Sequence, residues 1–161
     1  MKCGLLVYFG MSILPGLAHA QSRVAPQWVW HNEGDAAQGA PAGERFFRKT
    51  VVFDRLRVVK VDVTADDEFV LYLNGREVGR GADWHRVYSF DVTEHAQVGT
   101  NVLAIRAKNS DGPAGLMVRG YVGWANGTQW TFSSDGTWRS TAEELPGWER
   151  LLKPELSQWS E

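Results

Sequence analysis

Cysteine is almost missing from this chain, and its absence excludes several kinds of chemistry. The 161 residues include one cysteine, Cys3. It lies in a stretch that begins with a positive charge at Lys2, continues as an apolar run and ends in Ala18-His19-Ala20. This pattern predicts a secretory signal over residues 1–20 that is cleaved before Gln21. The mature chain therefore has no cysteine for a disulfide, a thiolate metal site or a catalytic nucleophile.

A long apolar run and an excess of basic residues are also missing. The apolar part of the signal is too short to span a bilayer and is broken by Pro15-Gly16. Loss of Lys2 leaves 16 basic residues against 19 acidic ones in the mature chain. Because no basic block occurs, neither nucleic acid nor an anionic membrane is expected as a partner. We expect a secreted or periplasmic protein with no membrane attachment after cleavage.

What the mature chain does contain is enough for one folded domain. Its 141 residues (161 less the 20 of the signal) fall within the usual domain size of roughly 100–200. Strand-like runs, separated by Gly, Asn and Asp at intervals of roughly 8–12 residues, are typical of a β-sandwich. We predict an N-terminal segment and loop over 21–45, a sandwich over 46–140 and a tail over 141–161.

The strands are expected where apolar residues alternate with polar ones. The alternation is cleanest from Val59 to Ala65, whereas both faces of 46–53 are mixed. No stretch before residue 142 has a convincing helical period. The expected strands are 46–53, 58–65, 69–73 with its return strand, 87–92, 101–109, 116–122 and 129–133.

The sharpest local signal is Asn74-Gly75, which follows the apolar run from Phe69 to Leu73. A type I′ turn needs a positive φ at both central residues, and Asn-Gly tolerates this better than other pairs. We therefore predict a tight hairpin. Apolar residues occupy both faces of its first strand, so we expect that strand inside a sheet that is covered on both sides.

The C-terminal tail shows a different pattern. Apolar residues between Trp148 and Trp159 fit one face of a helix, but Pro154 interrupts it. We expect either a short helical turn docked on the sandwich or the start of a linker.

A series of short motifs links the chain to a known family. In order they are Trp28-Val29-Trp30, Phe46-Phe47-Arg48-Lys49, Tyr72-Leu73-Asn74-Gly75 with Val78-Gly79, Trp84, Phe90-Asp91-Val92-Thr93, Gly99-Thr100-Asn101-Val102-Leu103 and Asn109. From Trp28 to Trp138 the chain resembles the N-terminal jelly-roll domain of bacterial α-L-rhamnosidases. The sugar-binding domain of β-galactosidase-type hydrolases shows a similar run of motifs.

This resemblance implies an all-β, antiparallel jelly-roll sandwich of the galactose-binding-like type, with about eight strands, and a carbohydrate-associated role. In those hydrolases the sandwich accompanies a much larger catalytic domain, and this chain ends soon after Trp138. The resemblance carries no catalytic residue over to this sequence, so we do not expect an enzyme.

Three acidic residues, Asp66, Asp67 and Glu68, stand at the start of the hairpin strand and are the first candidates for chemistry. They fit the acid and base of a glycosidase, a solvated turn, or a structural calcium site built from carboxylate oxygens. We favour the solvated turn over catalysis. No cofactor is expected apart from that calcium ion, whose presence stays open.

Two further groups of residues have plain structural interpretations. His31, His85 and His95 lack the short spacing of a zinc site. Asn126-Gly127-Thr128 matches a glycosylation sequon but also fits a hairpin turn, which we favour.

Eight tryptophans are many for a chain of this length. Trp28, Trp30, Trp130 and Trp138 lie near strand-like runs, and most of them are expected in the core. Trp84 lies instead in a polar, glycine-rich connection. It either folds back on the core or offers a flat apolar face to a sugar ring, while Asp and Asn side chains bind the hydroxyl groups.

Counting strand directions assigns each connection to one end of an antiparallel sandwich. The Asn74-Gly75 turn falls at one end, whereas the loops before residue 46, after 65, over 79–86 and over 109–112 fall at the other. Ligand sites on such scaffolds lie mostly in loops. We therefore predict one sugar or calcium site bordered by Asp66, Asp67, Trp84, His85, Asn109 and Asp111.

The sequence thus predicts a secreted, non-catalytic carbohydrate-binding or glycosidase-accessory module. Its expected partner is carbohydrate or a glycosidase catalytic domain. Two other interpretations stay open: a protein-interaction or scaffolding sandwich with no sugar affinity, and a fragment of a larger glycoside hydrolase.

Overall fold

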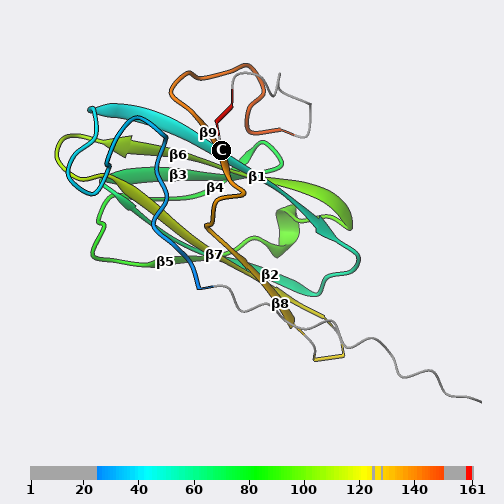
Figure 1. Ribbon diagram of the computed structural model, residues 1–161. Helices are drawn as coiled ribbons and strands as arrows, with labels where there is room; N and C mark the ends of the chain where they lie inside the picture. Colours follow the sequence, from blue (N-terminus) through cyan, green and yellow to red (C-terminus); the bar gives the residue numbers. More distant parts are fainter. Residues whose placement is uncertain (1–24, 125, 128, 151–158, 161) are drawn as a thin grey trace, which may run out of the picture.

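The computed structural model describes residues 25–124, 126–127, 129–150 and 159–160. The predicted signal, its cleavage site before Gln21 and most of the apolar residues of the tail lie outside this part of the chain. Within it, two antiparallel sheets pack face to face (Figure 1). The predicted all-β sandwich is therefore confirmed. No helix in the described residues is long and apolar enough to cross a membrane.

One sheet has five strands in the order β4-β3-β6-β1-β9, and the other has four in the order β5-β2-β7-β8. A 3₁₀ turn over Thr93–His95 follows β5. The strands are β1 (Gly43–Phe53), β2 (Val58–Asp66), β3 (Glu68–Leu73), β4 (Arg76–Gly81), β5 (Tyr88–Asp91), β6 (Gly99–Asn109), β7 (Gly115–Gly123), β8 (Gln129–Ser133) and β9 (Arg139–Thr141).

Every strand expected from the sequence is present, but two features differ from expectation. Strand β1 begins at Gly43, within the predicted loop, because Gly43 to Arg45 pair with the last residues of β6. Strand β9 is not expected from the sequence, since three residues are too few to show an alternating pattern. The strands of the sandwich therefore run from Gly43 to Thr141.

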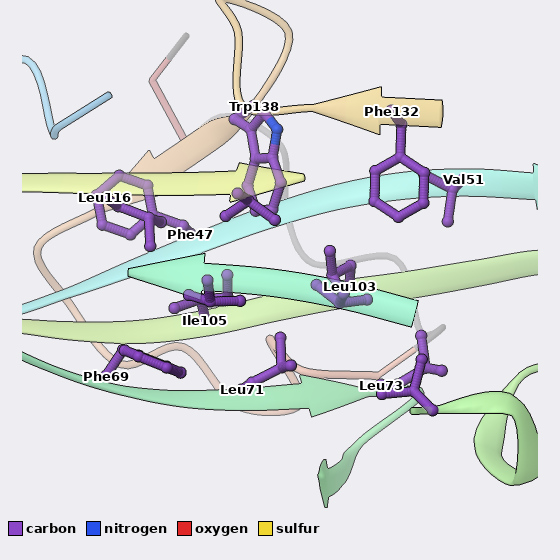
Figure 2. Close-up of a cluster of buried hydrophobic side chains, with 14 of the residues drawn as sticks. Phe47, Val51, Phe69, Leu71, Leu73, Leu103, Ile105, Leu116, Phe132 and Trp138 are labelled. Carbon is purple, nitrogen blue, oxygen red and sulfur yellow. The ribbon is translucent and has the colours of Figure 1, made fainter. Parts of the chain in front are cut away.

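The main hydrophobic core lies between the two sheets (Figure 2). The alternating residues of β2 from Val59 to Ala65 are at most 1% exposed, as the pattern predicts. Burial of this inner face supplies the main driving force for the sandwich, at about 25 cal/mol per Å² of apolar surface. Other inward side chains include Phe47, Val51, Phe69, Leu71, Leu73, Leu103, Ile105, Leu116, Phe132 and Trp138.

A second, smaller apolar cluster lies on the outer face of the five-stranded sheet. Trp148 packs edge-on against Phe46 of β1, at 5.0 Å between ring centroids, and against Tyr72 of β3, at 5.5 Å. Trp159 is buried in the same cluster. Residues 142–150 reach it through turns and form no helix. This second layer explains why the outer face of β1 carries an apolar Phe46 beside polar residues, and it covers the outer face of β3 at Tyr72.

The predicted hairpin is confirmed. Asn74 has a φ of 53° and Gly75 a φ of 84°, the two positive values that a type I′ turn requires. The Asn74 side chain accepts a hydrogen bond from the Val102 N–H at 2.9 Å and donates one to the Asn101 carbonyl oxygen Oδ1 at 2.9 Å. We call this end of the sandwich the closed end.

Candidate ligand-binding pocket

A pocket of about 780 Å³ lies at the opposite end, which we call the pocket end. The strand register explains why distant segments meet there: Gly43 pairs with Asn109, and Asp66 pairs with Gly115. The connections that leave these strands lie together at the left of Figure 1. The lining of the pocket comes from residues 28–30, 35–37, 66–67, 84 and 111–115.

Two tryptophans of the lining keep much of their surface exposed, 46% for Trp84 and 51% for Trp28. The Trp84 carbonyl accepts a hydrogen bond from Thr64 Oγ1 at 2.9 Å, which fixes the backbone of its loop. The His85 ring stacks on the Trp84 ring at 3.8 Å between centroids. Trp28 lies directly on Gly115, where an added Cβ would be 2.6 Å from its Cε3 atom.

Two adjacent carboxyl groups of the lining differ in their electrostatics. Asp67 Oδ2 accepts a hydrogen bond from the Ser110 N–H at 2.8 Å, and this bond holds the pKa of Asp67 below its usual value. Burial, followed by the neighbouring Asp67 carboxylate, raises the pKa of Asp66. The pair therefore binds its first proton more readily at Asp66 than at Asp67.

The pocket brings together four of the six residues predicted from the sequence: Asp66, Asp67, Trp84 and Asp111. The other two lie beside it. His85 is exposed and supports Trp84 through ring stacking, and Asn109 is 1% exposed and donates from Nδ2 to the Ala40 carbonyl at 2.9 Å. Ligand binding by any of these residues stays a prediction.

Sequence reasoning misses Trp28 and Asp35 as lining residues. Trp28 belongs to the tryptophans expected mostly in the core, and the other three, Trp30, Trp130 and Trp138, do pack on the main core. The alternation of the strands gives no information on Trp28, because the segment around it forms a bridge at Val29 and no strand. Asp35 lies in the long loop that strand counting assigns to this end.

The remaining candidates have structural surroundings. Glu68 lies outside the lining and pairs with Lys108 on the surface at 2.8 Å. Asn126 and Gly127 lie in the connection between β7 and β8, where the sequence favours a turn over a glycosylation site. Among the described residues, no group of three or more His, Cys, Asp or Glu side chains is arranged to hold a metal ion.

Two antiparallel sheets with a pocket among the loops at one end make a galactose-binding-like sandwich. No protein-family model matches the chain. The α-L-rhamnosidase of Streptomyces avermitilis is 35% identical to it over an alignment 141 residues long, which covers 82% of this chain and 14% of that enzyme. The crystal structure of that rhamnosidase, complexed with L-rhamnose, superposes with a TM-score of 0.76.

A lectin from Pleurotus ostreatus is also similar, at 29% identity and a TM-score of 0.73, over 83% of this chain and 39% of the lectin. The same lectin in complex with GalNAc gives a TM-score of 0.71. The α-L-rhamnosidase of Dictyoglumus thermophilum shares the fold at a TM-score of 0.69 and 18% identity, over 84% of this chain and 20% of that enzyme.

These similarities confirm the resemblance to α-L-rhamnosidases that the sequence motifs predict. The similarity is restricted to a small part of the enzyme, however. The chain spans only 14% of the length of the rhamnosidase that it matches, so that enzyme's activity is not transferred to this protein by the match.

Proposed function

We propose that this protein is an exported, non-catalytic module that binds carbohydrate in the pocket between Trp28 and Trp84. The observation that carries the proposal is the combination of two half-exposed indole rings with four aspartate side chains in one pocket of about 780 Å³. That volume lies within the usual range for small-ligand sites, roughly 300–1,000 Å³.

A sugar ring has two kinds of surface, and the pocket offers a partner for each. The apolar C–H face of a pyranose packs on an indole ring, a contact that we expect to contribute about 1 kcal/mol. The hydroxyl groups donate hydrogen bonds to carboxylates, which contribute about 1.5–3 kcal/mol each. Trp28 and Trp84 are suited to the first contact, and Asp66, Asp67 and Asp111 to the second.

The similar proteins support this proposal. The Pleurotus ostreatus lectin was solved in complex with GalNAc, and the Streptomyces avermitilis rhamnosidase in complex with L-rhamnose. We propose that this chain, like the part of the rhamnosidase that it matches, accompanies a glycosidase catalytic domain, either as a separate accessory protein or as part of a longer chain.

A glycan array followed by titration calorimetry tests the proposal. We expect a dissociation constant near 1 mM, which corresponds to about −4 kcal/mol. Replacement of either ring, in Trp84→Ala or Trp28→Ala, should weaken binding about fivefold, the loss expected for one stacked ring. Repeating the titration with EDTA tests whether a structural calcium ion takes part.

Trp124→Ala is the matched control, because the Trp124 ring lies near the closed end and donates from Nε1 to the Arg55 carbonyl at 2.7 Å. It should bind glycan as the wild type does. The proposal fails if the wild type binds no glycan, or if both pocket variants fold and bind with unchanged affinity. If this protein binds a protein partner and shows no affinity for glycans, a scaffolding role is favoured.

Two further measurements test the other parts of the proposal. A screen of chromogenic glycosides should show no hydrolysis, since the module is proposed to be non-catalytic. N-terminal sequencing of exported protein should begin at Gln21. Recovery of exported protein that begins at Met1 would contradict the predicted cleavage.

A further inference from the structure

One wall of the pocket is built by a segment that forms no strand of either sheet. Residues 28–37, here called the N-terminal wall, contribute Trp28, Trp30 and Asp35 to the lining. The wall joins the four-stranded sheet through a bridge in which Val29 and Leu116 exchange N–H···O=C hydrogen bonds at 2.9 Å, and its Ala36 carbonyl accepts a hydrogen bond from the Ala114 N–H at 3.0 Å. A segment with so little regular pairing needs side-chain contacts to keep one position.

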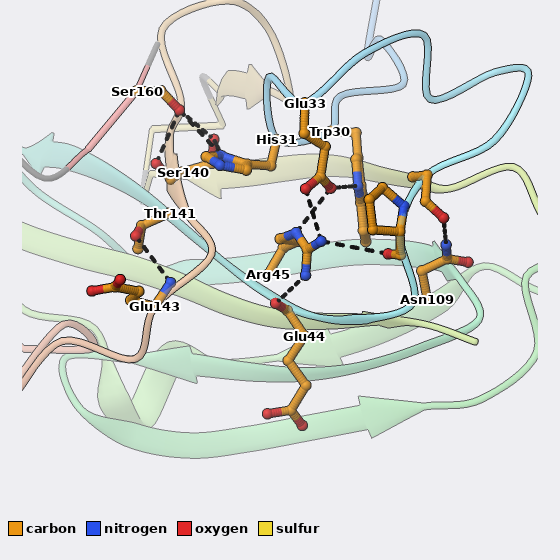
Figure 3. Close-up of polar contacts among 12 residues, drawn as sticks. Trp30, His31, Glu33, Glu44, Arg45, Asn109, Ser140, Thr141, Glu143 and Ser160 are labelled. Carbon is orange, nitrogen blue, oxygen red and sulfur yellow. Dashed lines mark hydrogen bonds and ion pairs between the residues drawn. The ribbon is translucent and has the colours of Figure 1, made fainter. Parts of the chain in front are cut away.

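A partly buried ion pair supplies one contact of this kind (Figure 3). Arg45 lies at the start of β1 and is 7% exposed. Its Nε and Nη2 atoms donate to the two carboxylate oxygens of Glu33, each at 2.8 Å. Glu33 Oε1 also accepts a hydrogen bond from Trp30 Nε1 at 2.9 Å. One carboxylate thus connects a core strand to an aromatic ring of the wall.

The chemistry of this pair favours orientation over net stability. Burial alone would raise the pKa of Glu33, but the hydrogen bonds from Arg45 and Trp30 hold that pKa below its usual value. The two-pronged contact fixes the direction of both side chains, since the guanidinium and the carboxylate are planar. Buried pairs of this kind are often no more stabilising than apolar side chains of similar size.

We propose that Arg45 and Glu33 are positioning residues for the ligand: they hold the N-terminal wall, and with it Trp28, in the place that the pocket requires. Trp30 transmits this position, because its ring is hydrogen-bonded to Glu33 and packs on Phe47 of the core at 5.5 Å between centroids. The effect on ligand affinity rests on the proposed carbohydrate site, whereas the effect on the wall does not.

Hydrogen exchange of single amides tests the proposal in Arg45→Met and Glu33→Gln. Protection of the Val29 N–H should fall about tenfold as the wall opens locally, while protection of the core residue Leu103 should stay unchanged. Glycan affinity should fall about fivefold, because the ligand must then order the wall when it binds.

Arg48→Met is the matched control. Arg48 lies on the same strand, but its Nη1 atom donates to the carbonyls of Trp148 and Arg150 at 2.7 and 2.8 Å on the outer face. Loss of its charge should leave both Val29 protection and glycan affinity unchanged. Equal loss of Val29 protection in Arg48→Met and Arg45→Met would overturn the proposal.

The double variant Glu33→Leu/Arg45→Met separates position from stability, since an apolar pair should preserve the fold. We expect a folded protein with a loosened wall. The proposal is overturned if this variant folds and keeps wild-type protection at Val29. It is also overturned if all three variants unfold, because the pair would then support the whole sandwich. If the wild type binds no glycan, the proposed function is contradicted, but hydrogen exchange at Val29 still tests the role of the ion pair in holding the wall.

Discussion

The closed end and the pocket end of the sandwich use polar side chains in opposite ways. At the closed end, the Asn101 carboxamide is 0% exposed. Its Oδ1 accepts from Asn74 Nδ2 and the Gln97 N–H, both at 2.9 Å, and its Nδ2 donates to the carbonyls of Gln97 and Gly99. At the pocket end, Asp66 and Asp111 line a cavity instead of closing a network.

Comparison of the two ends shows which of the sequence motifs stabilise the fold. Asn74-Gly75 and Asn101 belong to the motifs that carry the resemblance to rhamnosidases, and both stabilise the closed end. They therefore predict the sandwich, not its ligand. Trp28 and Trp84 belong to the same series of motifs but lie at the pocket end, and the aspartates proposed to bind sugar lie outside the motifs.

The largest expected effect is at the closed end, in Asn101→Ala. Removal of the carboxamide leaves the Gln97 N–H, the Gln97 and Gly99 carbonyls and Asn74 Nδ2 without this partner, so the free energy of unfolding should fall by about 3 kcal/mol. Glycan affinity of the folded fraction should not change. Thermal or urea unfolding together with calorimetry checks both statements. A variant as stable as the wild type would break the distinction between the two ends.

A smaller loss of stability is expected for Gly75→Val at the same end. Gly75 has a φ of 84°, which a β-branched residue adopts only with strain, and an added Cβ would lie 2.7 Å from Arg150 Cγ. The change should lower the free energy of unfolding by about 2 kcal/mol. An unchanged melting temperature would show that the turn tolerates side chains and that the backbone is not restrained there.

The next effect belongs to the pocket end and should appear in binding more than in stability. In Gly115→Ala the new methyl group meets the Trp28 ring, which must move away. We expect glycan affinity to fall about threefold to fivefold, with a stability change below about 0.5 kcal/mol because Trp28 is half exposed. Gly136→Ala is the control, since an added Cβ there meets nothing within 4 Å.

The smallest effect concerns pH. Hydrogen bonds from Thr93 Oγ1 and N–H hold the pKa of Asp91, near the closed end, below its usual value, whereas burial raises that of Asp66. Ionised Asp91 therefore stabilises the fold above the usual Asp pKa of about 3.9, and this contribution is lost as the pH falls through the lowered pKa. Asp66 acts in reverse: stability falls as the pH rises from about 3.9 through its raised pKa.

Stability curves of Asp91→Asn and Asp66→Asn check these signs. Above about pH 5, Asp91→Asn should be less stable than the wild type and Asp66→Asn equally or more stable. If both substitutions changed the free energy of unfolding in the same way at every pH, the carboxyl groups at the two ends would have the same surroundings.

Most of the fold is predictable from the sequence because short stretches of residues indicate each strand and turn. The alternation from Val59 to Ala65 gives the buried face of β2, and Asn74-Gly75 gives the hairpin. Strand β9 is not predictable, since Arg139 to Thr141 form a strand only because β1 is there to pair with them.

The candidate site is predictable in part, for a topological reason. Strand counting alone places Asp66, Trp84 and Asp111 at one end, because each antiparallel connection must alternate between the ends. It gives no means of separating the pocket lining from its surroundings. Asn109 donates to the Ala40 carbonyl, and His85 stacks on Trp84 beside the pocket. Both placements depend on the direction of the side chain, which strand counting does not give.

The all-β class, most strand positions and the end at which the loops gather follow from the sequence alone, since these depend on residue period, turn chemistry and strand direction. Packing in the folded chain decides that Trp28 stays half exposed on Gly115 and that Arg45 pairs with Glu33, twelve residues away. It also decides that Trp148 covers the outer face of the five-stranded sheet. The sequence pattern around each of these residues does not indicate its contact partner, so only the packing of the sheets brings the partners together.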